Sequence, residues 1–261
     1  MKRFFNLAVI ITWFYVGIHL IWWVWMGDPS NFIDGAVRHE PIPGNIPGTV
    51  HTGGFLVGVL MAFVLIAITF IIERALTMSK AKGKGNPEVF IKNMIAKLAD
   101  GDLDGAKEDC DAQRGTVANI MRAAITRFQD VEDDPEYSAD KKIAETQRAI
   151  DEAMNLETPL LEKNLVVLST VASIATMVGL LGTTLGMIRA FSALAESGTV
   201  SATALSIGIS EALYNTAGGL IGAVIAIIAY NFFTTKVDSF VYMIDEAILS
   251  VTQIFTIRTK K

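Results

Sequence analysis

The sequence predicts an all-α, polytopic membrane protein with four transmembrane helices and a helical cytoplasmic region. Of its 261 residues, 51% are hydrophobic, which is more than an ordinary soluble domain of this length contains. Four uncharged runs reach the length of about 20 residues that a helix needs to cross a bilayer. These runs cover residues 4–26, 53–72, 165–188 and 212–233.

The first run has two possible interpretations, because a basic start before an apolar stretch also opens a secretory signal peptide. This run is longer than a typical signal core, ends in the bulky sequence WWVWM at 22–26 and has no small-x-small cleavage site. Tryptophans are typical of the membrane–water interface. We therefore expect residues 1–52 to form a retained transmembrane helix and an outer loop.

Basic residues beside the four runs predict the orientation. They are Lys2, Arg3, Arg74, Lys80, Lys82, Lys84, Lys163, Lys236, Arg258, Lys260 and Lys261. Because basic flanks stay in the cytoplasm, both termini are expected there. The second transmembrane helix then covers 53–72, a cytoplasmic region covers 73–164, paired transmembrane helices cover 165–233, and a cytoplasmic amphipathic tail covers 234–261.

The cytoplasmic region has the apolar spacing of helices. Asn86 and Pro87 form a helix start, and an apolar stripe follows until Gly101. A second stripe runs from 117 to 128, and the acidic segment 131–138 is expected to be a loop. A long helix follows, with an interruption or bend expected near Pro159. Another stripe runs from 237 to 255, and these helices are expected to pack together.

Several function classes are excluded by what the sequence lacks. The single cysteine, Cys110, cannot form an intrachain disulfide, and the scattered histidines His19, His39 and His51 suit packing or surface roles better than metal binding. The segment AKGKGN at 81–86 lacks phosphate-loop spacing. The net charge of −5 argues against nucleic acid. We expect neither an enzyme nor a cofactor.

The third run has a stripe of hydroxyl residues, and both last runs have small residues at helical spacing. Ser169, Ser173, Thr176 and Thr183 share one face of the third run. The small residues include Gly179, Gly182, Gly186, Gly218 and Gly222, which contain two GxxxG motifs. Tight helix packing alone explains such residues in membranes.

Helix packing alone does not explain Glu211. This acidic residue directly precedes the last apolar run, and no other charged residue follows it until Lys236. An ionised group near the bilayer centre costs about 2.5–3.5 kcal/mol on insertion scales. Arg189, at the outer end of the third run, is the one basic candidate for an ion pair. Protonation or a water-filled cavity are the alternatives, and Asn215 or Tyr214 could hydrogen-bond the carboxyl group.

The two last runs also carry a family resemblance. The sequences STVASIATMVGLLGTTLGMIRAFSAL and GISEALYNTAGGLIGAVIAIIAYNFF resemble the paired-helix signature of the MotA/TolQ/ExbB proton channel family, closest to ExbB-like proteins of Bacteroidetes type. The resemblance covers about residues 50–255. Thr176 and Ile225 stand where many members have proline, and the N-terminal span is an addition to three-span ExbB proteins.

The resemblance implies a homopentamer with a central pore that holds the helix of an ExbD-like partner bearing an aspartate. Proton flow would then drive a TonB-like protein that serves outer-membrane transport. The motifs imply that Glu211, Thr183 and Thr216 form the proton pathway in the bacterial inner membrane. At 100° per residue, Thr216 lies about 140° around the helix from Glu211, so the two need not line one surface.

Three alternatives remain open from the sequence. Within the channel class, the chain could belong to a TolQ-like envelope motor or a MotA-like stator. Outside that class, it could be a non-conducting membrane scaffold whose small residues only hold helices together. A scaffold would tolerate replacement of the threonine hydroxyls, whereas a proton path would not.

Overall fold

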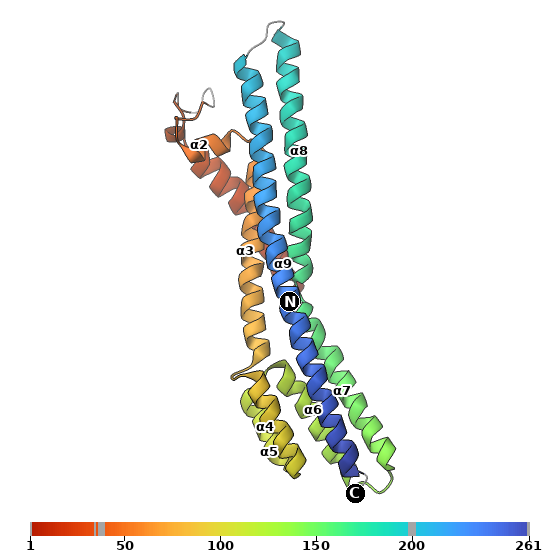
Figure 1. The fold of residues 1–261 in the computed structure, drawn as a ribbon. Helices are drawn as coiled ribbons and strands as arrows, with labels where there is room; N and C mark the ends of the chain where they lie inside the picture. Colours follow the sequence, from red (N-terminus) through yellow and green to blue (C-terminus); the bar gives the residue numbers. More distant parts are fainter. Residues whose placement is uncertain (1, 34, 36–39, 198–201, 260–261) are drawn as a thin grey trace. The chain divides into compact units, whose positions relative to one another are not determined.

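The computed structural model describes residues 2–33, 35, 40–197 and 202–259, which are almost entirely helical (Figure 1). His39, Lys260 and Lys261 lie outside these residues. The chain divides into two compact units. The first comprises Met1–Ile72 and Asn164–Asn231, and the second comprises Glu73–Lys163 and Phe232–Lys261.

The predicted all-α class with four membrane-spanning helices is confirmed for the described residues. Four helical segments are long and apolar enough to cross a bilayer. They lie within Asn6–Met26, Phe55–Asp100, Ala139–Ser192 and Leu205–Thr259, and each includes most or all of one predicted run.

The N-terminal span consists of helix α1, Lys2–Tyr15, followed by the π-helix η1, Val16–Met26. It packs on α3, Phe55–Lys82, in the first unit. A Cβ atom on Gly17 would lie 2.8 Å from the backbone nitrogen of Ala62, so only glycine allows this approach. Beside this contact, Phe14 and Phe63 pack edge to face with ring centroids 5.5 Å apart. The additional span is therefore attached to the chain's own α3.

The connection after the N-terminal span is folded against the end of η1. It contains a 3₁₀ turn, η2 (Pro29–Asn31), and helix α2, Ile46–His51, whose first turn is capped by Asn45. The rings of Trp22 and His51 stack with centroids 4.9 Å apart. Trp22 Nε1 also donates a hydrogen bond of 3.4 Å to the His51 carbonyl. These contacts fix α2 next to the start of α3.

Helices α8 (Leu165–Ser197) and α9 (Ala202–Thr259) run side by side in opposite directions in the first unit (Figure 1). Both extend beyond the apolar runs 165–188 and 212–233, because α8 continues to Ser197 and α9 begins at Ala202. The predicted tail 234–261 is helical as far as the structure describes it, because α9 continues through it without a break to Thr259. No glycine or proline occurs between residues 223 and 259 to end the helix.

The second unit contains α4 (Pro87–Asp100), α5 (Leu103–Gln113), α6 (Gly115–Glu132) and α7 (Ala139–Glu162), together with the later parts of α3 and α9. The predicted start and end of α4 are confirmed: Asn86 Oδ1 accepts from the Glu88 N–H at 3.0 Å, and Gly101 has a φ of +90°. Helix α5 was not predicted, because its apolar face is short. The core includes a stack of Phe128 on Phe255, with centroids 4.0 Å apart.

Two sequence expectations about α6 and α7 need correction. The acidic loop is shorter than 131–138, because α6 continues to Glu132 and Ser138 already caps α7. Pro159 does not end α7, which continues to Glu162. The chain breaks instead at Asn164, whose φ of +66° is left-handed and incompatible with a continuing right-handed helix.

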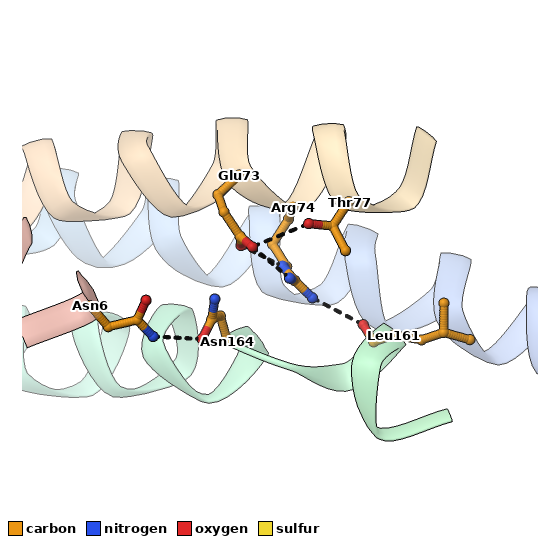
Figure 2. Close-up of polar contacts among 6 residues, drawn as sticks. All are labelled: Asn6, Glu73, Arg74, Thr77, Leu161 and Asn164. Carbon is orange, nitrogen blue, oxygen red and sulfur yellow. Dashed lines mark hydrogen bonds and ion pairs between the residues drawn. The ribbon is translucent and has the colours of Figure 1, made fainter. Parts of the chain in front are cut away.

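Buried polar contacts secure the helix ends near this break (Figure 2). In the second unit, Arg74 Nη1 donates to the Leu161 carbonyl at 3.1 Å, and the Glu73 carboxylate accepts from the same guanidinium and from the Thr77 hydroxyl. This supplies a donor to a terminal carbonyl of α7. In the first unit, Asn6 Nδ2 donates to Asn164 Oδ1 at 2.9 Å.

Candidate proton site

Glu211 forms an ion pair with Arg189 across the α8–α9 contact. The carboxylate oxygen Oε1 of Glu211 accepts from Arg189 Nη1. The Glu211 side chain is only 11% exposed, whereas that of Arg189 is 61% exposed. The ion pair offsets the cost of burying the carboxylate, so burial by itself does not require proton transfer.

The turn between α2 and α3 closes over the same carboxylate. Gly54 has a φ of +77°, and a Cβ atom there would lie 2.5 Å from Glu211 Oε1. Its neighbour Gly53 approaches the Cβ atom of Tyr214 in the same way. Tyr214 thus lies beside this turn. No sequence pattern connects these two glycines with Glu211, because more than 150 residues separate them.

Asn215 is buried beside Glu211, with 1% of its surface exposed. Its Nδ2 donates to the Gly53 carbonyl at 2.7 Å and to the Glu211 carbonyl at 3.0 Å. The predicted neighbourhood of the two residues is therefore present, but these bonds reach the backbone of Glu211 and of the turn. The side chain lies against Gly182, where any larger residue would collide with it.

Thr183 and Thr216 face each other between α8 and α9, with their hydroxyl groups in hydrogen-bond contact. Thr183 Oγ1 also lies 3.3 Å from the Gly179 carbonyl, and Thr216 Oγ1 lies 3.2 Å from the Ala212 carbonyl. Because each hydroxyl has one proton, one threonine donates to its partner while the other donates to the carbonyl of its own helix. Both side chains are half-buried. The structure therefore brings together the two threonines that the family motif singles out.

The other predicted hydroxyls bond along α8. Ser169, Ser173 and Thr176 donate to the carbonyls of Val166, Ser169 and Ala172, respectively. Ser173 is exposed, while Ser169 and Thr176 are half-buried. These three residues are separate from the Thr183–Thr216 pair, and Ser173, the exposed one, is accessible to another helix.

The predicted packing glycines lie at helix contacts in the first unit. Gly179 and Gly186 approach the backbone of α9 near Gly219 and Ala212, with Gly182 between them. Gly218 and Gly222 instead approach Leu60 and Val64 of α3. The two GxxxG motifs thus pack different pairs of helices, which explains how α9 contacts α8 and α3 at the same depth.

Within the described parts of the chain, no group of three or more His, Cys, Asp or Glu side chains could hold a metal ion. The chemistry available at the site is an acid paired with a guanidinium, an amide and two hydroxyls. Carboxyl and hydroxyl groups can both accept and donate protons. These groups lie between long apolar helices of a multi-span helical membrane protein.

Comparison with known proteins identifies the class. Residues 112–246 match the model of the MotA/TolQ/ExbB proton channel family, and the chain belongs to that family. The chain is 30% identical over 187 residues to a Synechocystis protein described as biopolymer transport protein ExbB-like 3, covering 69% of this chain and 81% of that relative. With these relatives, its four spanning helices indicate a multi-pass bacterial inner-membrane protein.

Other relatives carry two different names. The Tol-Pal system protein TolQ of Pseudomonas aeruginosa is 36% identical over 120 residues, which is 46% of this chain and 52% of TolQ. The biopolymer transport protein ExbB of Aquifex aeolicus is 46% identical over 77 residues, 30% of this chain and 52% of ExbB. The chain spans about half the length of these two relatives. They support an ExbB/TolQ-type proton channel subunit.

Proposed function

We propose that the chain is an ExbB-like subunit of an inner-membrane motor, in which proton flow does work on a TonB-like protein. The observation that supports this proposal is the presence of an intramembrane acid, Glu211, and the Thr183–Thr216 hydroxyl pair at the same α8–α9 contact. Along α9, Glu211 and Thr216 are about 7.5 Å apart at a rise of about 1.5 Å per residue, and they lie about 140° apart around the helix. Proton transfer between them therefore requires water or a group from another subunit.

One subunit offers one acid and an incomplete path, so the proposal requires several copies and a second acid. A homopentamer around an ExbD-like single-span protein supplies both, with the aspartate of the partner helix accepting protons in the pore. The exposed hydroxyls of α8 and the packed α8–α9 pair suit this arrangement. Lipid surrounds the assembly, and neither nucleic acid nor a cofactor is needed.

The ion pair with Arg189 sets a condition on the mechanism. A carboxylate that holds a guanidinium cannot also bind a proton at the same oxygen, so Glu211 must leave Arg189 or use Oε2 when it is protonated. The membrane potential supplies about 2.3 kcal/mol per charge for each 100 mV. With both termini in the cytoplasm, α8 and α9 present Glu211 toward the outer side, where protons enter.

Replacement of Glu211 by Gln tests the proposal, because Gln keeps the size and loses the ionisable proton. The complex with its single-span partner is reconstituted in vesicles, and proton uptake is followed with a pH dye. We expect loss of flux with an unchanged oligomeric mass. The matched control is Glu162→Gln, at an exposed position at the end of α7. Full flux through Glu211→Gln would refute the pathway role.

The TolQ-like function is the second candidate, because TolQ of Pseudomonas aeruginosa matches a longer stretch than ExbB of Aquifex aeolicus. The MotA-like stator and the scaffold have no such support from a named relative. Copurification from the native membrane distinguishes the two motors: a TonB-like protein in the complex supports the ExbB proposal. Copurification of a peptidoglycan-associated system, in place of the TonB-like protein, supports the TolQ alternative.

A further inference from the structure

The turn at Gly53 and Gly54 lies directly against the Glu211 carboxylate. A side chain at Gly54 would fall within 2.5 Å of Oε1 and 3.6 Å of Arg189 Nη1, so backbone atoms of the turn occupy that side of the ion pair. Arg189 Nη1 approaches the same oxygen from a second direction, and its side chain is largely exposed. The carboxylate is therefore covered from one direction by a backbone turn and from another by an exposed cation.

Asn215 is the residue that ties this turn to α9. Its amide group donates at 2.7 Å to the Gly53 carbonyl and at 3.0 Å to the carbonyl of Glu211 itself. Its Oδ1 is buried and has no hydrogen-bond partner among the described residues. The two donated bonds thus determine the orientation of the amide, and the space left by Gly182 accommodates it.

We propose that Asn215 is a positioning residue for proton exchange: it holds the Gly53–Gly54 turn against Glu211, so that the carboxylate exchanges its proton on the side of Arg189. This inference rests on the proposed function, because the reaction it concerns is protonation of Glu211. Release of the turn would open a second route from the outer connection. Proton entry would then no longer depend on movement of Arg189.

Carbodiimide modification of the intact protein in membranes measures the shielding directly. Dicyclohexylcarbodiimide reacts with a protonated carboxyl group, and the adduct on Glu211 is quantified by peptide mass spectrometry. Asn215→Leu keeps the branched shape of the side chain and removes the donors. We expect Glu211 to be modified about fivefold faster in Asn215→Leu, the change in opening that loss of one typical hydrogen bond produces. An unchanged rate would overturn the proposal.

A glycine pair provides the second variant and its control, should Asn215→Leu fail to assemble. Gly54→Ala forces the turn away from the carboxylate, whereas Gly44→Ala has the same left-handed backbone, with a φ of +83°, and nothing within 4 Å of the added atom. We expect faster modification in Gly54→Ala only. Equal rates in both variants would show that the turn does not shield Glu211.

The pH profile of proton flux separates positioning from a purely structural role. With the turn released, flux should persist over a wider range of outer pH, while the oligomeric mass stays the same. If Glu211→Gln abolishes flux but Asn215→Leu changes neither modification nor pH profile, the proposed function stands and the positioning role falls. If Asn215→Leu speeds the modification of Glu211 but Glu211→Gln conducts protons normally, the turn does shield Glu211 and the proposed function fails. The role of Asn215 in proton exchange then fails as well.

Discussion

The hydroxyl groups of Thr183 and Thr216 are in hydrogen-bond contact between α8 and α9, and each lies within hydrogen-bond distance of a carbonyl of its own helix. Valine has nearly the shape of threonine and cannot relay a proton. We therefore expect Thr183→Val and Thr216→Val each to stop proton flux in vesicles. Assembly should survive, because one lost hydrogen bond changes stability by only about 1 kcal/mol.

Thr184→Val is the matched control for the hydroxyl pair. Its hydroxyl donates to the Leu181 carbonyl at 2.8 Å on the exposed side of α8, one residue away from Thr183. Flux should be normal in this variant. Normal flux in Thr183→Val and Thr216→Val as well would favour the non-conducting scaffold over a channel.

The Arg189–Glu211 pair should show measurable coupling in a double-mutant cycle. Removal of Arg189 alone leaves a carboxylate that is almost buried without its cation, whereas removal of both partners leaves no charge. We expect a coupling of about 1 kcal/mol or more between Arg189→Gln and Glu211→Gln in thermal unfolding of the solubilised protein. Arg122 and Asp111, an exposed pair 2.7 Å apart, should give less than about 0.5 kcal/mol. A smaller value for Arg189–Glu211 than for the exposed pair would contradict this interpretation.

Arg74 should be important for stability, because its side chain is 1% exposed and caps α7 (Figure 2). Arg74→Met leaves the Leu161 carbonyl without this donor and removes the Arg74–Glu73 ion pair. We expect a loss of about 3 kcal/mol, with faster hydrogen exchange in the last turn of α7. Arg148→Met, at an exposed position paired with Glu152, should change stability by less than about 0.5 kcal/mol. Equal effects of the two substitutions would mean that the cap contributes little.

Cys110 allows a pH test of the second unit. Burial raises the pKa of its thiol from 9.0 to about 12. Between these values the folded protein holds a proton that the unfolded chain has lost, so stability falls as the pH rises through this window. Cys110→Ala should lack this part of the alkaline decline in thermal stability. Iodoacetamide at pH 8 should label Cys110 slowly until denaturant is added, and rapid labelling of the folded protein would contradict the burial.

The sequence was sufficient for the helices with long, regular patterns. Four apolar runs predicted the spans, and Asn86 with Gly101 predicted both ends of α4, because caps and turns are local features. The sequence was not sufficient where the apolar pattern was short or a single residue was misleading. The apolar face of α5 is too short to show a helical period, and local sequence rules do not predict that α7 continues past Pro159 to Glu162.

At the candidate site, the family motif identifies residues but does not predict which groups of the chain they contact. Glu211 and Arg189 were recognised as a possible pair from their positions near the same end of two adjacent helices. The contact of Glu211 with Gly54 could not be foreseen, since the turn belongs to a connection with no periodic pattern. Which carbonyl Asn215 reaches is likewise a matter of tertiary packing.

The stack of Phe128 on Phe255 has a consequence for biosynthesis. The aromatic partner of α6 is encoded more than 120 codons later, near the end of α9, and the last two membrane spans are translated in between. The helices of residues 87–162 therefore emerge from the ribosome with an unfilled core, and they must wait for the final turns of the chain before they reach their native state. A chaperone that shields this apolar surface during synthesis would prevent aggregation at that stage.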